Sequence, residues 1–223
     1  ISIEVNASPI RNSEQEVCGV VLVFHYVSEL RSLAQMTYHA THDSLTSLIN
    51  RREFEKRVSQ ALENARDKDT RYALCYLDLD NFKKINDSYG HQVGDKALQH
   101  AVAVIQEHMR PSDIFGRYGG EEFVIVLPGT NLNDAKCAAE RIRRAVAEIR
   151  LTFRSATLHD TVSVGLAQAE ETDDPQSLIR RADDALYAAK EAGRNLSYFH
   201  NGQTCLPITA TVVSDTVVVA ESS

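Results

Sequence analysis

The chain has 223 residues, enough for one ordinary domain with a buried core or for one domain with part of another. Acidic residues outnumber basic ones by 31 to 24, giving a net charge of −7. This balance argues against a nucleic-acid or anionic-membrane binder, because such a protein needs a basic face. Hydrophobic residues make up 43% and charged residues 25%, which is typical of a globular protein rather than a disordered one. The longest apolar run, Val17 to Phe24, is too short to cross a bilayer, and no signal-peptide pattern opens the chain.

The first residue is Ile1 rather than Met, and we expect the chain to be a piece of a longer protein. Its four cysteines are scattered, without a Cys-x-x-Cys pair, and no secretory signal accompanies them. We therefore expect reduced thiols in a cytoplasmic protein. His39 and His42 lie three residues apart, but no third ligand is near them in the sequence, which disfavours a zinc site.

The first 28 residues have the pattern of a β-hairpin. Ile1 to Val5 alternates apolar and polar residues, a polar turn follows from Arg11 to Glu16, and Val17 to Phe24 is an apolar run of strand length. A lone hairpin is too small to be stable, so we expect it to complete the sheet of an upstream domain. Residues 29–42 are expected to form a helical linker. A short coiled coil is the alternative, because heptad spacing relates Val27, Leu30, Ala34 and Thr37.

From Thr41 onward, amphipathic periodicity predicts helices and short apolar runs predict strands. The order helix, strand, helix, hairpin, helix, strand, helix indicates a mixed α/β sheet with helices packed against it. Gly193 is expected to end the last helix. The stretch from Gln203 on fits either a loose tail or a short strand pair. The expected elements are Arg51–Arg66, Tyr72–Leu77, Ala97–Met109, Ile114–Tyr118, Glu122–Leu127, Asp134–Ile149, Thr161–Ala167 and Pro175–Ala192.

An acidic strand end and a Gly–Gly hairpin are the first candidates for chemistry. Asp78 and Asp80 end an apolar strand, and we expect one carboxylate to face a ligand and the other to face the structure. Glu121 and Glu122, beside Gly119–Gly120, would add oxygen ligands of the kind that suit Mg²⁺. Glycines at a hairpin tip also let a phosphate approach the backbone. The alternatives are a solvated acidic strand end and an ordinary turn.

Two further segments carry groups suited to a nucleotide. Phe82–Asp87 is expected at a strand-to-helix turn, where backbone amides and Lys83 could hold phosphate. Asn86 and Asp95, both expected in loops, could pair with the guanine edge that carries N1–H and the 2-amino group. The alternatives are a solvated helix start and ordinary turn residues.

Lys190 and Arg194 lie four residues apart at the end of the last helix, on one of its faces. Both could hold phosphates. They could equally complement the negative end of the helix dipole.

The segment Arg117–Phe123 reads Arg-Tyr-Gly-Gly-Glu-Glu-Phe and resembles the signature of the GGDEF family of diguanylate cyclases, in its GGEEF form. The resemblance covers roughly Thr41 to Phe199, because further family motifs occur in the same order and spacing. These are Asp43-x-Leu45-Thr46-x-Leu48-x-Asn50-Arg51-Arg52, Asp78-x-Asp80-x-Phe82-Lys83-x-x-Asn86-Asp87, Gly90-His91-x-x-Gly94-Asp95, Ser163-Val164-Gly165 and the helix from Ala182 to Asn195.

The resemblance implies a palm-like mixed sheet flanked by helices, as in nucleotide cyclases, over residues 43–200, with residues 201–223 as a tail. It implies an enzyme that joins two GTP molecules, one on each protomer of a homodimer, into cyclic di-GMP and releases two pyrophosphates. It further implies a Mg²⁺ cofactor, with Mn²⁺ as a substitute. Neither nucleic acid nor a membrane is expected as a partner of this segment.

The family's catalytic and metal roles fall on matching residues of this sequence. The resemblance makes Asp78 and Glu121 the metal ligands, with the Leu79 carbonyl and Glu122 completing the site. Glu121 is also a candidate base, and Lys83 is the catalytic cation.

The family's nucleotide-binding roles fall on a second set. Asn86 and Asp95 would read guanine, and an acceptor pair left unpaired by adenine would select against ATP. Lys190 and Arg194 would bind phosphates with Lys83, assisted by backbone amides near Phe82.

A regulatory site is implied as well. Arg110-Pro111-Ser112-Asp113 fits the family's RxxD inhibitory motif at its usual spacing from the glycines. Arg110 and Asp113 would bind cyclic di-GMP, with Arg141 contributing from the next helix, since an arginine can fork onto phosphate and stack on a base. The alternative is a surface ion pair.

The front piece, Ile1 to Ser28, resembles the last hairpin of a PAS sensor domain, which implies an upstream sensor as a partner. It ends in Tyr26-Val27-Ser28 where PAS domains often carry an Asp-x-Thr motif. A second departure is Ser47, at a position of the opening motif where the family usually has Gly.

An active cyclase is the first hypothesis, because every matched catalytic position holds a competent residue. The alternative is a catalytically silent GGDEF module that binds GTP or cyclic di-GMP and regulates a partner.

Overall fold

The computed structural model describes residues 3–26, 36–68, 71–153 and 156–209. The chain divides into two compact units, Ile1–Ser44 and Leu45–Ser223, which are described separately here. Among the helices in the described ranges, none combines the length and the hydropathy that a bilayer crossing needs.

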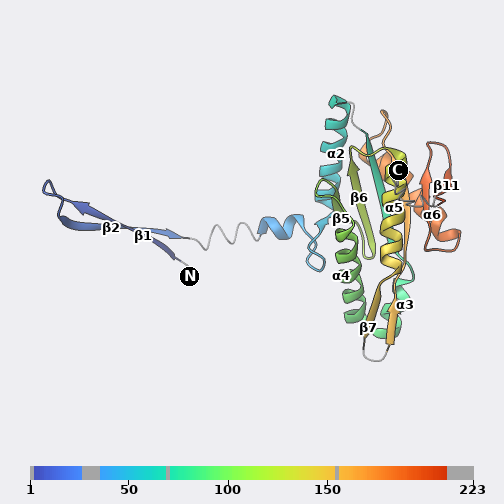
Figure 1. Cartoon of the computed structure of the whole chain (residues 1–223), viewed down its shortest axis with the longest axis horizontal. Coiled ribbons are helices and arrows are strands. Elements are labelled where there is room, and N and C mark those ends of the chain that lie inside the picture. The colour runs from blue at the N-terminus through green and yellow to red at the C-terminus, as the bar shows by residue number, and fades with distance from the viewer. Residues whose placement is uncertain (1–2, 27–35, 69–70, 154–155, 210–223) are drawn as a thin grey trace, which may run out of the picture. The chain divides into compact units, whose positions relative to one another are not determined.

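The first unit contains the expected hairpin, which is confirmed (Figure 1). Strands β1 (Ile3–Arg11) and β2 (Val17–Tyr26) pair antiparallel. The side chain of Asn12 organises the turn, since its Oδ1 accepts hydrogen bonds from the backbone N–H groups of Glu14 and Glu16, each at 2.9 Å.

Apolar side chains cover both faces of this hairpin. Four consecutive residues of β2, Val20 to Val23, necessarily alternate between the faces, yet each is at least 44% exposed. Residues 36–41 are helical, as expected for the end of the linker, while residues 27–35 lie outside the described part.

The second unit is built on a seven-stranded mixed sheet, and the expected mixed α/β fold is confirmed (Figure 1). Strands run in the order β11-β10-β9-β4-β6-β5-β3. β4 pairs antiparallel with both β6 and β9, whereas the pairs β9–β10 and β3–β5 are parallel. The bounds are β3 Ile49–Asn50, β4 Tyr72–Leu79, β5 Ile114–Arg117, β6 Glu122–Pro128, β9 Val162–Gln168, β10 Ser197–His200 and β11 Cys205–Pro207.

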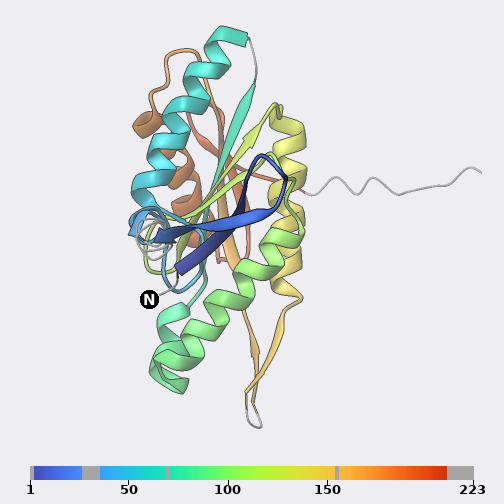
Figure 2. The ribbon, with the colours of Figure 1, turned by 90° about the vertical axis from the view of Figure 1, so that its left-hand side faces the viewer.

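Helices cover both faces of the sheet (Figure 2). Side chains of β4 alternate between two cores: Ala73, Cys75 and Leu77 pack with α4 and α5, while Leu74 and Tyr76 pack with α2 and α6. A strand buried on both faces in this way explains the continuous apolar run in the sequence. The helices are α2 Arg51–Lys68, α3 Phe82–Tyr89, α4 His91–Glu107, α5 Leu132–Ala147 and α6 Pro175–Glu191.

The main helices begin and end at recognisable signals. Asn131 caps α5 by accepting hydrogen bonds from the N–H groups of the second and third residues of the helix. Asp174 and Ser177 form a capping box on α6, with Pro175 in its first turn. Gly193, expected to end α6, follows the C-cap Ala192 with φ +124° and confirms that prediction.

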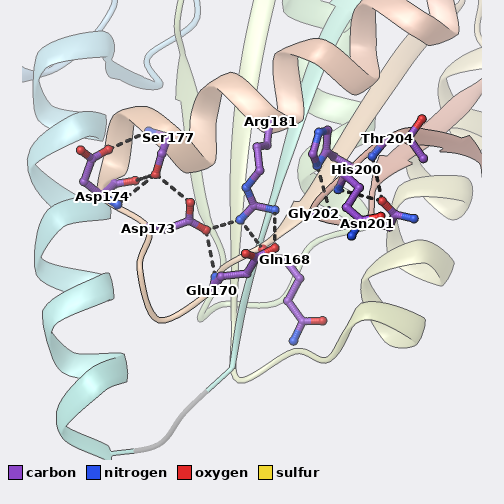
Figure 3. A network of polar contacts seen from close by, with 11 residues as sticks. Gln168, Glu170, Asp173, Asp174, Ser177, Arg181, His200, Asn201, Gly202 and Thr204 are labelled. Carbon is purple, nitrogen blue, oxygen red and sulfur yellow. Dashed lines mark hydrogen bonds and ion pairs between the residues drawn. The ribbon is translucent and has the colours of Figure 1, made fainter.

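A buried ionic network fastens α6 to the end of β9 (Figure 3). Arg181 donates to the Gln168 carbonyl at 2.8 Å and pairs with the carboxylates of Asp173 and Glu170. Asp173 also accepts from the hydroxyl of Ser177 at 2.7 Å. Asp173 is only 5% exposed, so its buried negative charge is compensated by these partners. The same contacts hold the loop before α6 in one geometry.

The structure differs from the sequence-based expectation between residues 82 and 109. The helix expected at Ala97 begins at His91, and the segment from Phe82 is a full helix. Asn86 and Asp95 therefore lie on helices, and their expected placement in loops was wrong. Gly90 alone, with φ +84°, interrupts the helical backbone.

Several short elements had no clear sequence signal. A two-stranded ribbon of β7 (Arg150–Phe153) and β8 (Ala156–His159) was not expected. β11 pairs with β10, so the residues after Gln203 begin as a strand and the sheet continues past residue 200, the expected end of the domain. Residues 210–223 lie outside the described part.

The departure at Ser47 has a structural meaning. Ser47 has φ +60°, in the left-handed region that favours glycine, so the turn keeps a glycine-like backbone despite the substitution. A residue with a Cβ is disfavoured there by roughly 1 kcal/mol.

We expect Ser47→Gly to raise the free energy of unfolding by about 0.5–1 kcal/mol, because it removes this conformational strain. Urea denaturation of the two chains would measure the difference. Ser44→Gly, the same change at a residue without positive φ, is the control and should be neutral or slightly destabilising. A Ser47→Gly variant less stable than the parent chain would contradict the strain argument.

Candidate active site

The register of two strands brings the acidic residues together. Asp78, near the end of β4, lies opposite Glu122 at the start of β6. The Leu79 N–H donates to the Glu121 carbonyl at 3.2 Å, so the loop before β6 is tied to the end of β4. The structure thus places Asp78, Glu121 and Glu122, the expected metal ligands, where β4 ends and β6 begins.

Lys190 reaches into this acidic group from the last turn of α6. Its Nζ lies 2.8 Å from Asp78 Oδ2, and the two side chains are 30% and 8% exposed. Sequence analysis placed Lys190 with phosphate, and in the structure it neutralises Asp78. The ion pair therefore holds the place that a bound cation would need.

Burial raises the pKa of Asp78, although the hydrogen bond and charge of Lys190 oppose the shift. Burial, and then the Asp78 carboxylate, raises the pKa of both Glu121 and Glu122. Asp183 on α6 adds a further negative charge near Glu122. Lys190 opposes these shifts, with Arg194 acting on Asp78 and Arg51 on Glu122, but the carboxylates of Asp78, Glu121, Glu122 and Asp183 outnumber these cations, so the site carries excess negative charge.

The donor set of this site suits a hard divalent cation, since carboxylate oxygens and a backbone carbonyl are the ligands that Mg²⁺ prefers. Within the described ranges, no three His, Cys, Asp or Glu side chains are already grouped as a metal site. Lys190 engages Asp78 instead. The chemistry of the donors fits a cation.

Asp80 has a different environment from Asp78. Its carboxylate accepts hydrogen bonds from the hydroxyls of Thr161 and Ser163, each at 2.7 Å, and from the backbone N–H of Asn195 at 2.9 Å. With these bonds Asp80 joins β4, β9 and the loop after α6. Of the two aspartates, Asp80 is the one that faces the structure.

Arg117, two residues before Gly119, holds the Gly–Gly loop by hydrogen bonds. Arg117 donates from Nη2 to the Gly120 carbonyl at 2.6 Å and from Nε to the Gly119 carbonyl at 3.2 Å. Neither glycine has positive φ. A Cβ at Gly119 would lie 2.2 Å from Glu122 Oε2, whereas a Cβ at Gly120 would meet nothing within 4 Å. A side chain at residue 119 would thus displace the Glu122 carboxylate, whereas Gly120 leaves open backbone.

Tyr118 fixes the same hairpin to α2. Its hydroxyl donates to Glu55 Oε1 at 2.9 Å, and the guanidinium of Arg51 lies 4.3 Å from the centre of its ring. The signature contains Arg117 and Tyr118, but the sequence indicated no role for either of them. The spacing of the motif cannot reveal a contact between Tyr118 and Glu55, which are 63 residues apart in the chain.

The expected guanine-reading residues lie where α3 meets α4. Asn86 Oδ1 is buried and has no hydrogen-bond partner among the described residues. A Cβ at Gly94 would lie 2.0 Å from that oxygen, so the glycine makes room for the Asn86 amide. Asp95 follows Gly94 in the first turns of α4 and is exposed. A buried unpaired acceptor is costly, and a ligand donor would satisfy it.

The other expected phosphate contacts lie at two places. Phe82 and Lys83 begin α3, with Phe82 buried and Lys83 exposed. Arg194 follows α6 with φ +66°, and its charge acts on Asp78 together with that of Lys190. Lys190 and Arg194 thus approach the same strand end from α6.

The RxxD segment forms a tight turn before β5. The Arg110 N–H donates to Asp113 Oδ2 at 2.8 Å, and the Asp113 N–H donates back to the Arg110 carbonyl at 3.0 Å. In the part of the chain that the structure describes, no ion pair joins the two side chains. Arg141 donates from Nη2 to the His108 carbonyl at 3.0 Å, which places α5 beside the turn. Burial, and then the Asp113 carboxylate, raises the pKa of the Cys75 thiol to about 12.

Comparison with known families decides the assignment of this domain. Residues 40–196 match the family described as diguanylate cyclase, GGDEF domain. The chain belongs to the GGDEF family.

Two curated relatives are similar to this chain in sequence. The diguanylate cyclase DgcM of Escherichia coli is 40% identical over 181 residues, which are 79% of this chain and 42% of DgcM. The diguanylate cyclase DgcP of Pseudomonas aeruginosa is 38% identical over 156 residues, or 70% of this chain and 23% of DgcP. The chain thus spans less than half the length of either relative.

Solved GGDEF structures share the fold. The coiled coil and GGDEF domain of DgcB from Caulobacter crescentus, in complex with c-di-GMP, is 36% identical, with a TM-score of 0.73 over 78% of this chain and 93% of that one. The active GGEEF domain of a diguanylate cyclase from Vibrio cholerae is 34% identical, with a TM-score of 0.66 over 70% of this chain and 99% of that one.

The raised pKa of Glu121 predicts how stability depends on pH. A carboxyl group whose pKa rises on folding stabilises the fold while protonated, and this contribution is lost as pH rises through the folded-state pKa. We therefore expect Glu121→Gln to stabilise the chain near pH 7, by about 0.5 kcal/mol because solvent screens the site.

The gain should shrink as the pH of urea denaturation is lowered toward 4.5, the ordinary pKa of the carboxyl. Glu171→Gln, at an exposed position in the loop before α6, is the control and should give no such trend. A stability difference that is constant over this range would contradict the electrostatic account of the site.

Proposed function

We propose that this chain is the catalytic part of a diguanylate cyclase, which condenses two GTP molecules into cyclic di-GMP and releases two pyrophosphates. The observation that carries the proposal is that Asp78 lies opposite Glu122 where β4 ends and β6 begins, with Lys190 paired to Asp78, while Asn86 carries a buried acceptor without a partner among the described residues. Oxygen ligands suit a divalent cation, a lysine suits a phosphate and an unpaired acceptor suits a donor of the base, so these groups together fit a metal-bound guanine nucleotide.

Asp78, Glu121, Glu122 and the Leu79 carbonyl would hold Mg²⁺ or Mn²⁺, the GGEEF loop supplying the two glutamates. A divalent cation bound there would neutralise phosphate charge and lower the pKa of the attacking hydroxyl. The excess negative charge around Lys190 supports this assignment, because ionised carboxylates in a half-buried site need a counter-ion.

Lys190 has two partners in this proposal. It must leave Asp78 before that carboxylate can accept another cation, and its ammonium is then free for a phosphate. Arg194 and Lys83 would add phosphate contacts from the other two segments, with the amides near Phe82. The same lysine would thus neutralise Asp78 before a nucleotide binds and contact a phosphate afterwards.

Guanine would be selected at the junction of α3 and α4. Asn86 offers a buried acceptor and Asp95 an exposed carboxylate one residue after Gly94, so N1–H and the 2-amino group would each find an acceptor. Adenine lacks this donor pair and would leave the acceptors unpaired, which costs binding energy.

The reaction needs two protomers. Each 3′-hydroxyl loses its proton and attacks the α-phosphorus of the opposite GTP, while the bond to the bridging oxygen breaks and pyrophosphate leaves. Glu121 is the candidate to accept the proton. Since one chain offers one nucleotide site, two copies must face each other, and we propose a homodimer as the active form.

The first unit would control the association of the two protomers. The hairpin exposes apolar residues on both faces, and this supports its role as the end of an upstream PAS-like sensor domain whose remaining strands would cover it. The helical segment to Thr41 would join sensor and catalytic domain. The four free thiols and the use of GTP fit a cytoplasmic location.

The direct test is incubation of the purified chain with GTP and Mg²⁺ at several protein concentrations, with chromatographic separation of products. We expect cyclic di-GMP, with activity per chain rising with concentration because the site is shared between protomers. Glu121→Gln should lower kcat by about 10²-fold or more while the circular dichroism spectrum stays unchanged. Unchanged activity of this variant would contradict the metal-site assignment.

A catalytically silent nucleotide-binding module is the alternative. If no product forms, the chain should be fused to a dimeric coiled coil, which replaces the upstream sensor. If the fused chain forms cyclic di-GMP, the cyclase assignment stands, and the inactivity of the unfused chain is explained by its missing dimerisation. Tight GTP binding with no product from the fused chain would favour the module.

Product inhibition through the RxxD turn gives a second test. Arg110 is exposed and makes no ion pair with Asp113 among the described side chains, so its guanidinium is available to a phosphate or a base. We expect Arg110→Ala to raise the concentration of cyclic di-GMP needed for half-inhibition by about tenfold. The initial rate should stay within about twofold, since the turn lies outside the catalytic group. An unchanged inhibition curve would contradict the inhibitory site.

A further inference from the structure

Arg143 on α5 connects that helix to the loop after α6. Its Nε and Nη2 donate to the two carboxylate oxygens of Glu140 at 2.9 and 3.1 Å. Its Nη1 donates to the backbone oxygen of Asn195 at 3.1 Å and to the side-chain oxygen at 2.6 Å. The Arg143 and Glu140 side chains are only 15% and 13% exposed. The guanidinium is therefore held in one orientation by partners on both sides.

The loop that Arg143 contacts has an unfavourable backbone. Gly193, Arg194 and Asn195 have φ values of +124°, +66° and +50°. Two consecutive non-glycine residues in the left-handed region persist only where surrounding contacts enforce that conformation. The loop therefore depends on the groups that hold it.

Asn195 is held from a second side by β4. Its backbone N–H donates to Asp80 Oδ2 at 2.9 Å, and Asp80 is fixed in turn by Thr161 and Ser163. Asn195 thus lies between α5 and the strand that carries Asp78. Arg194 is the residue directly before it, so the direction of its side chain follows from how Asn195 is held.

We propose that Arg143 is a positioning residue for the nucleotide: it keeps Asn195 in its left-handed conformation and thereby directs Arg194 toward the phosphates. This inference rests on the proposed function, in which Arg194 binds phosphate, and extends the site to a residue on a different helix. It predicts that the contribution of Arg143 to nucleotide affinity disappears when Arg194 is absent.

The chain provides a matched control in the next residue. Arg144 also pairs with Glu140, at 3.5 Å, but it is 54% exposed. Within the ranges that the structure describes, no hydrogen bond or ion pair joins its side chain to residues 193–195. Arg143→Met and Arg144→Met remove the same charge from adjacent positions, and only the first removes the contact to Asn195.

The experiment is a double-mutant cycle on ligand affinity. Arg143→Met, Arg194→Met, their combination and Arg144→Met are titrated by calorimetry with Mg²⁺ and the α,β-methylene analogue of GTP, which cannot release pyrophosphate. Guanosine affinity is measured by competition with a fluorescent guanine nucleotide. The temperature of unfolding is recorded for every chain.

We expect Arg143→Met and Arg194→Met each to weaken the analogue about tenfold, as the loss of a charged phosphate contact should. The combined variant should match Arg194→Met within about twofold, because the two residues act through one contact. Guanosine affinity should not change in any variant, since guanosine has no phosphate. Arg144→Met should bind the analogue as the parent chain does.

Three results would overturn the proposal: an unchanged affinity of Arg143→Met, additive losses in the combined variant, or an equal loss for guanosine, which would indicate general damage to the fold. An unchanged affinity of Arg194→Met would instead contradict the phosphate role in the proposed function. Should Arg143→Met fail to fold, Asn195→Ala replaces it. Alanine lacks the side-chain acceptor of Arg143 and is disfavoured at φ +50°, so this variant should weaken the analogue and show the same non-additivity with Arg194→Met.

Discussion

The antiparallel register of β4 with β6 places Asp78 opposite Glu122, and every other feature of the site is arranged around that pairing. A slip by one residue would turn Asp78 toward the core formed with α4 and α5 and move Leu77 and Leu79 out of it. The register is protected by the two cores, since alternate residues of β4 are buried against different helix pairs. The hydrophobic pattern of the strand thus fixes where the acidic residues lie.

The charge of the site is balanced from a distant part of the chain. Burial raises the pKa values of Asp78, Glu121 and Glu122, and the Asp78 charge further raises those of both glutamates, which destabilises the fold when all three are ionised. Lys190 offsets part of this repulsion through its 2.8 Å contact with Asp78. Repulsion between neighbouring carboxylates lowers the free energy of unfolding, and any cation or ligand that neutralises them raises it. Stability and ligand binding are therefore linked at this site.

The two aspartates at the end of β4 show how context divides identical side chains. Residues two apart in a strand share a face, but β4 ends at Leu79, and the backbone turns before Asp80. Asp80 then meets two hydroxyls and the Asn195 N–H, while Asp78 meets only the lysine among its described polar contacts. One carboxylate is saturated by the fold, and the other remains available to exchange its partner.

The sequence by itself determined the main helices and strands, the mixed sheet and the family, because hydrophobic periodicity and motif spacing are local properties. It could not decide that Asn86 and Asp95 lie on helices, since Gly90 and Gly94 look alike in sequence but only Gly90 has a positive φ, while Gly94 lies inside α4. Nor could it reveal the contact of Lys190 with Asp78 or of Arg143 with Asn195. Those contacts join residues far apart in the chain, and they exist only because the sheet and its two helix layers bring α5 and α6 to the same strand end.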